Sequence, residues 1–100
     1  MEIINSQDFE KRVLKNNKTV LVDFFATWCG PCRMLSPILE QVASETDAEI
    51  LKVDIDESMD LARRFGIMSV PTMILFKNGE EVNRMTGLRQ KAQILSMINE

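Results

Sequence analysis

Residues 19–35 read TVLVDFFATWCGPCRML, a strand pattern followed directly by a helix pattern. Thr19 to Phe25 is a β-branched and aromatic run interrupted by Asp23, which is typical of a central strand covered on both faces. From Pro31 to about Glu45, apolar residues recur at the spacing of one helix face. They are Met34, Leu35, Ile38, Leu39 and Val42. The segment therefore predicts a buried strand that leads into an amphipathic helix.

Three further segments downstream have the pattern of strands. Ile50–Asp54 completes a strand-helix-strand unit, whose two strands should be parallel and whose crossover should be right-handed. Thr72–Lys77 and Glu81–Met85 flank Asn78-Gly79, a strong signal for a tight hairpin. Because the last two strands should be antiparallel, the sequence predicts a mixed sheet.

Three more helices are expected to cover this sheet. The first runs from Ser6, as its cap, to about Asn17, and a short one runs from Ser58 to Phe65 with Gly66 as its stop. Gln90–Asn99 forms the last helix. Its expected buried residues are Ile94, Leu95 and Ile98, while Met34 and Met59 fall at core spacing in the earlier helices. With 100 residues and 45% hydrophobic content, we expect one domain spanning residues 1–100.

Charge and composition exclude several classes of function. The net charge is only −3, with basic and acidic residues interspersed, so nucleic acid is not an expected partner. Met1–Ser6 lacks the basic and apolar regions of a secretory signal, and no apolar run is long enough to cross a bilayer. Small secreted domains usually carry several spaced cysteines, whereas this chain has two, close together. These features predict a cytoplasmic protein.

The chemical site is expected at Cys29 and Cys32, where the central strand ends and the helix begins. Open α/β sheets place their sites at the carboxyl ends of strands. Free backbone N–H groups and the positive end of the helix dipole stabilise a negative sulfur there, so Cys29 should be the more acidic thiol. Pro31 suits the first helical turn, and Gly30 is expected to permit a tight turn between the sulfurs.

A redox role for this pair competes with two others. The Cys29 thiolate would attack a substrate disulfide, and Cys32 would then attack the Cys29 sulfur and release the reduced substrate. A purely structural disulfide is one alternative, although closing so short a loop contributes only about 2 kcal/mol. A zinc site is the other, but the chain has no further cysteine and no histidine, so only a dimer sharing two pairs would supply four ligands.

Asp23 is an acid within a strand that should be buried. Desolvation should raise its pKa, so the carboxyl would be suited to accept a proton from Cys32 during its attack. Lys52, in the neighbouring strand, is the expected partner, and pairing with this lysine could coexist with proton transfer. The alternative is an acid that is merely paired with a cation.

Pro71 precedes the strand that begins at Thr72, and the sequence physics leaves its peptide bond open. An ordinary edge proline and a cis-proline are both compatible with this position. Met68 lies in the preceding loop, where it could be exposed near the site.

Several segments together resemble the thioredoxin family, and the match follows nearly the whole chain in order. They are Val22-Asp23-Phe24, Trp28-Cys29-Gly30-Pro31-Cys32, Pro37, Lys52-Val53-Asp54, Val70-Pro71-Thr72 and Phe76-Lys77-Asn78-Gly79. A lone CxxC is weak evidence, but here it stands within a full WCGPC segment. Phe25 departs slightly, since the family often has a different aromatic residue there.

The resemblance implies an α/β thioredoxin fold, with a central mixed sheet of five strands flanked by four helices. It implies a protein-disulfide reductase in which Cys29 is the nucleophile, Cys32 the resolving thiol, Asp23 the buried acid and Lys52 its partner. Gly30, Pro31 and Pro71, the last as a cis-proline, would tune the redox couple. Substrates would dock on an apolar rim made of Trp28, Met68, Val70, Pro71 and Gly87.

The resemblance also implies partners and the absence of a bound cofactor or metal. The Cys29–Cys32 couple would itself carry electrons, as a monomer. A flavin-containing, NADPH-dependent thioredoxin reductase would recharge it, and disulfide-containing client proteins would be its substrates.

Three alternatives remain at this point. A thiol oxidase or isomerase on the same fold usually carries His in the dipeptide between the cysteines, and a glutaredoxin typically carries Pro-Tyr. The Gly30-Pro31 dipeptide of this chain disfavours both. A binding module would use the apolar rim for docking alone.

Overall fold

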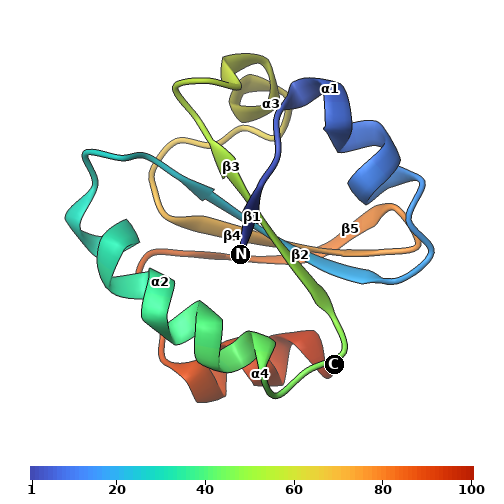
Figure 1. Cartoon of the computed structure of the whole chain (residues 1–100), viewed down its shortest axis with the longest axis vertical. Helices are drawn as coiled ribbons and strands as arrows, with labels where there is room; N and C mark the ends of the chain where they lie inside the picture. Colours follow the sequence, from blue (N-terminus) through green and yellow to red (C-terminus); the bar gives the residue numbers. More distant parts are fainter.

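The computed structural model describes all 100 residues and contains one five-stranded sheet with helices on both faces (Figure 1). The strands are β1 (Glu2–Ile3), β2 (Thr19–Phe25), β3 (Glu49–Asp54), β4 (Thr72–Lys77) and β5 (Glu80–Thr86). The helices are α1 (Ser6–Phe9) with its π-helical continuation η1 (Glu10–Leu14), α2 (Gly30–Ala43), α3 (Met59–Arg64) and α4 (Lys91–Ile98). None of these helices has the length and apolar character needed to cross a membrane.

Strand β2 lies at the centre of the sheet, whose order is β1-β3-β2-β4-β5. It pairs in parallel with β3 and antiparallel with β4, so its backbone is hydrogen-bonded along both edges. The β4–β5 pair is also antiparallel, as the Asn78-Gly79 turn predicted. These pairings confirm the mixed five-stranded sheet.

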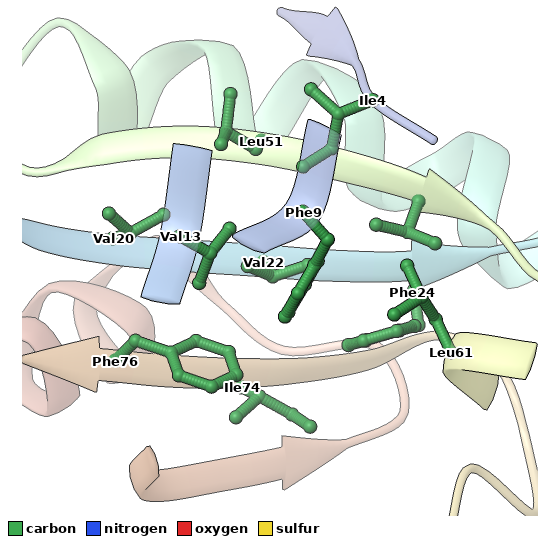
Figure 2. Close-up of a cluster of buried hydrophobic side chains, with 11 residues drawn as sticks. Ile4, Phe9, Val13, Val20, Val22, Phe24, Leu51, Leu61, Ile74 and Phe76 are labelled. Carbon is green, nitrogen blue, oxygen red and sulfur yellow. The ribbon is translucent and has the colours of Figure 1, made fainter. Parts of the chain in front are cut away.

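Two apolar layers cover the two faces of β2. Val20, Val22 and Phe24 point toward α1, η1 and α3, where Phe9 and Val13 pack over them (Figure 2). Leu21 points to the opposite face, into a cluster supplied largely by α2 and α4. Figure 1 shows these two helix pairs on opposite sides of the sheet. Because side chains alternate along a strand, Asp23 lies on the α2 face.

The first helix differs from its prediction at both ends. Asn5, not Ser6, is the N-cap, and its Oδ1 accepts a hydrogen bond from the Asp8 amide at 3.1 Å. Helical structure ends at Leu14 instead of near Asn17. The Asn16 side chain explains the early end, because it donates to a carbonyl of the previous turn and accepts from the next loop amide.

Some predicted core positions are also wrong. Met34 and Met59 are 61% and 56% exposed. The inward face of α2 is a narrow stripe of Leu35, Leu39 and Val42, and Met34 lies about 100° around the helix from Leu35. In α4, Met97 is buried where Leu95 was expected, and Leu95 is only partly covered.

The hairpin between β4 and β5 fixes the geometry of the last two strands. Asn78 and Gly79 have φ values of 52° and 78°, the left-handed region that this tight turn requires. At Gly79 a Cβ atom would lie 2.0 Å from the Leu14 carbonyl oxygen, so only glycine fits against the end of η1.

Candidate active site

Cys29 and Cys32 form a disulfide where β2 leads into α2. Cys29 is the N-cap of α2, and the Cα atoms of the two cysteines are 5.3 Å apart. The Cys32 amide donates to the Cys29 sulfur at 3.1 Å, in the way that an oxygen would cap the helix. The nucleophile proposed from the sequence therefore lies at the positive end of a 14-residue helix.

Gly30 and Pro31, the two residues between the cysteines, differ in how well they match the roles expected from the sequence. Pro31 stands in the first turn of α2, as predicted. Gly30 begins the helix and has no positive φ, so the turn between the cysteines does not use the left-handed conformation that favours glycine. A Cβ atom there would meet only the end of the Arg33 side chain, at 3.9 Å.

A second loop approaches the disulfide from the other side of the site. The Val70–Pro71 peptide bond is cis, which settles the alternative that the sequence left open. The Val70 carbonyl oxygen lies 3.6 Å from the Cys29 sulfur. The Gly87 amide donates to the Pro71 carbonyl at 2.8 Å, so the loop after β5 is hydrogen-bonded to the loop that contains Pro71.

The sequence placed five residues on an apolar rim; the structure strongly exposes two of them, leaves Val70 and Gly87 partly exposed and buries Pro71. Met68 is 95% exposed and Trp28 is 66% exposed. By contrast, Cys29 and Cys32 are only 5% and 3% exposed in the disulfide form. The surface around the sulfurs is therefore far more accessible than the sulfurs themselves.

Trp28 has a polar partner that the sequence did not indicate. Its indole Nε1 donates to Asp56 Oδ2 at 2.9 Å. The Asp56 amide in turn donates to Asp54 Oδ1, closing an Asx turn after β3. An Asp-x-Asp sequence at a strand end is a signal for such a turn, but its contact with Trp28 depends on tertiary structure.

Asp23 is completely buried, as the sequence predicted. Neither of its carboxylate oxygens accepts a hydrogen bond from another protein group. Burial raises its pKa from 3.8 to about 7, and the positive charge of Lys52 opposes this rise only partly. The carboxyl can therefore exchange a proton near neutral pH.

Lys52 is the direct neighbour of Asp23 in the β2–β3 register, but it does not form the ion pair expected from the sequence. Its charged nitrogen lies more than 4.0 Å from the Asp23 carboxylate, which is beyond salt-bridge distance. Instead, Lys52 Nζ donates to Ser36 Oγ at 3.0 Å and lies 4.4 Å from the centre of the Phe25 ring. Neither contact was anticipated, since each joins residues on different elements.

A cavity of about 240 Å³ lies next to Cys32. It is lined by Phe25, Ala26, Thr27, Cys32, Arg33, Ser36 and Lys52. A larger polar hollow of about 560 Å³ lies by Asn17 and Asp47, but it contains no member of the site. The cavity beside Cys32 is thus the one that connects the disulfide with the lysine.

Comparisons with known proteins agree on one family. The sequence matches the family model described as Thioredoxin over residues 1–100. A thioredoxin from Mycobacterium tuberculosis (strain ATCC 25618 / H37Rv) is 46% identical over 99 residues, covering 97% of this chain and 85% of the relative. A thioredoxin from Chlamydia muridarum (strain MoPn / Nigg) is also 46% identical and covers 100% of this chain and 97% of the relative.

Two further matches extend this result. A bifunctional thioredoxin reductase/thioredoxin from Mycobacterium leprae (strain TN) is 44% identical, covering 97% of this chain and 22% of the relative. Among solved structures, a mutant thioredoxin from Halobacterium salinarum NRC-1 has a TM-score of 0.91 and 40% sequence identity. That match covers 98% of this chain and 87% of the other.

The burial of Asp23 predicts how stability depends on pH. The carboxyl binds its proton more tightly in the folded than in the unfolded chain, so wild-type stability falls as pH rises between about 4 and about 7. Asp23→Asn removes this loss, which corresponds to roughly 4 kcal/mol. We expect the variant to match wild type near pH 4 and to be more stable above pH 7.

Urea unfolding of the oxidised protein across this pH range measures the difference in the free energy of unfolding. Asp47→Asn, at an exposed acid in the loop before β3, is the matched control and should show no such trend. A stability difference that does not change with pH would contradict the assignment.

Proposed function

Because the chain belongs to the thioredoxin family and is a dithiol–disulfide reductase with a redox-active Cys29–Cys32 disulfide, we propose the order in which its residues act. In the reduced protein the Cys29 thiolate attacks a sulfur of the client disulfide. That S–S bond breaks, a bond from Cys29 to the client forms, and one client thiolate leaves. The observation that carries this assignment is the Cys32 amide, which points at the Cys29 sulfur from the first turn of α2.

Cys32 then resolves the mixed disulfide. Its thiol gives a proton to the Asp23 carboxylate, and its sulfur attacks Cys29, which releases the second client thiolate. The Cys29–Cys32 disulfide forms, the client receives two electrons, and the proton held by Asp23 passes to solvent or to the departing thiolate. Support for this role of Asp23 is its complete burial without a hydrogen-bond partner and its pKa of about 7, which suits proton exchange at neutral pH.

We propose that clients dock on the rim formed by Trp28, Met68, Val70, Pro71 and Gly87, called the docking rim below. The cysteines are nearly covered, whereas Met68 and Trp28 are strongly exposed. A flexible methionine and an aromatic ring suit contact with many different apolar segments. Val70, whose carbonyl oxygen lies 3.6 Å from the Cys29 sulfur, would align the client backbone with that sulfur.

We propose a thioredoxin reductase as the partner that recharges the disulfide, drawing on NADPH. A relative in which the two activities are fused supports this pairing. The setting would be the cytoplasm, where such systems keep protein thiols reduced. The reductase must also reach Cys29, so it would use the docking rim.

The order of attack predicts opposite behaviour for two serine variants. Cys32→Ser should accumulate a mixed disulfide with an oxidised client protein through Cys29, because the resolving sulfur is missing. Cys29→Ser should accumulate none. Mass spectrometry of samples quenched under non-reducing conditions measures both, and trapping by Cys29→Ser instead would reverse the assignment.

The role of Asp23 predicts a selective kinetic defect. Asp23→Asn should slow resolution of the mixed disulfide at pH 7 on the order of 10²-fold and leave the first attack unchanged. Stopped-flow fluorescence of Trp28, the only tryptophan, follows both steps in a single turnover. Asp47→Asn serves as the control, and unchanged resolution in Asp23→Asn would remove the residue from the mechanism.

The docking rim predicts that binding and chemistry can be separated. Met68→Lys should raise KM for a client protein about tenfold while leaving the reaction with a small aromatic disulfide unchanged. Val82→Lys, at a 51% exposed position in β5 outside the rim, is the matched control. Equal KM values for the two variants would show that Met68 takes no part in docking.

A further inference from the structure

The position of Lys52 differs from what strand register alone would favour. Its backbone lies opposite Asp23, a buried carboxylate without a hydrogen-bond partner, yet its ammonium lies elsewhere. It is held by the Ser36 hydroxyl of α2 at 3.0 Å and by the face of the Phe25 ring at 4.4 Å. A hydrogen bond and a cation–π contact therefore replace an ion pair.

This arrangement leaves Asp23 with little electrostatic compensation. The facing residue of β4 is the uncharged Met73, and the cluster from α2 and α4 on this face is apolar. Arg33 lines the nearby cavity, but it is exposed and donates to the Thr27 carbonyl at 3.1 Å. The cysteines do not titrate while joined, so Lys52 is the charge that acts on Asp23.

The distance between the Lys52 ammonium and the Asp23 carboxyl determines how readily that carboxyl accepts a proton. A cation in direct contact would stabilise the charged carboxylate and make it a weak acceptor for the Cys32 proton. A cation held in the cavity still offsets part of the burial cost, but it does not neutralise the acid. Ser36 and Phe25 are the only groups seen to fix that distance.

We propose that Ser36 and Phe25 are positioning residues that hold the Lys52 ammonium in the cavity beside Cys32 and away from Asp23. They keep the carboxyl able to take up the proton that Cys32 releases on attacking Cys29. This proposal rests on the proposed role of Asp23 as the proton acceptor. It concerns the side chains that set the proton affinity of the acid, and not the acid itself.

A double-mutant cycle of Ser36→Ala and Lys52→Met tests the proposal. The readout is the carboxyl ¹³C chemical shift of Asp23 in the oxidised protein, followed by NMR as a function of pH. Without the hydroxyl, Lys52 should move to the unpaired carboxylate, so Ser36→Ala should lower the pH midpoint by about 1 pH unit. Lys52→Met should raise the midpoint, and Ser36→Ala should then have no further effect in that background.

Two variants make the cycle specific. Phe25→Leu, which keeps the position apolar, should lower the midpoint in the same direction as Ser36→Ala. Ser44→Ala removes a hydroxyl from the other end of α2 and should leave the midpoint unchanged. Alanine is favourable in a helix, so loss of folding is not expected to obscure either serine variant.

Two results would overturn the proposal. One is an unchanged midpoint in Ser36→Ala. The other is that Ser36→Ala lowers the midpoint in the Lys52→Met background by as much as it does in the wild type. The hydroxyl would then act on the hydration of the carboxyl and not through the lysine. Neither result bears on whether Asp23 accepts the proton, which the kinetics of Asp23→Asn decide separately.

Discussion

The hydrogen bonding of β2 on both edges, together with apolar packing on both of its faces, governs the rest of this structure. A strand buried in this way ends at a fixed point, so the turn that follows presents Cys29 at the same place as the start of α2. The same burial removes water from any polar side chain within the strand. It therefore places the disulfide and also makes Asp23 an acid that holds its proton to near neutral pH.

Two opposite electrostatic environments lie within this short segment. At Cys29 the backbone amides at the start of α2 favour negative charge on sulfur. At Asp23, a few residues earlier, desolvation disfavours negative charge on oxygen. In the proposed mechanism, the first environment would stabilise the thiolate that attacks the client, and the second would supply the proton acceptor for resolution. The difference arises because one group ends the strand and the other lies inside it.

The sequence predicted features that depend on local patterns. The bounds of β2 and β4 and the Asn78-Gly79 turn agree with the structure, because strand periodicity and turn chemistry act over a few residues. The paired cysteines, at the boundary between a predicted strand and a predicted helix, likewise indicated the site. Met34 was misassigned because helical spacing does not say how wide the buried face of a helix is.

Contacts between distant elements could not be predicted in this way. The sequence correctly placed Lys52 in the strand next to Asp23, and the two residues are paired in the register of the sheet. Register determines the position of the backbone but not that of the end of a long side chain. Where that ammonium lies depends on Ser36 from α2 and on Phe25 from β2, which only the packed fold brings together. The hydrogen bond from Trp28 to Asp56 has the same origin.

The docking rim and the proton-handling groups occupy different depths of the molecule. Met68 and Trp28 are strongly exposed, so in the proposed mechanism changes in them would alter recognition without disturbing the buried charges. Asp23 is fully enclosed, and Ser36 and Lys52 are partly covered and line a cavity together with Cys32. In the proposed mechanism, this separation would keep the proton affinity of Asp23 the same whichever client protein occupies the rim.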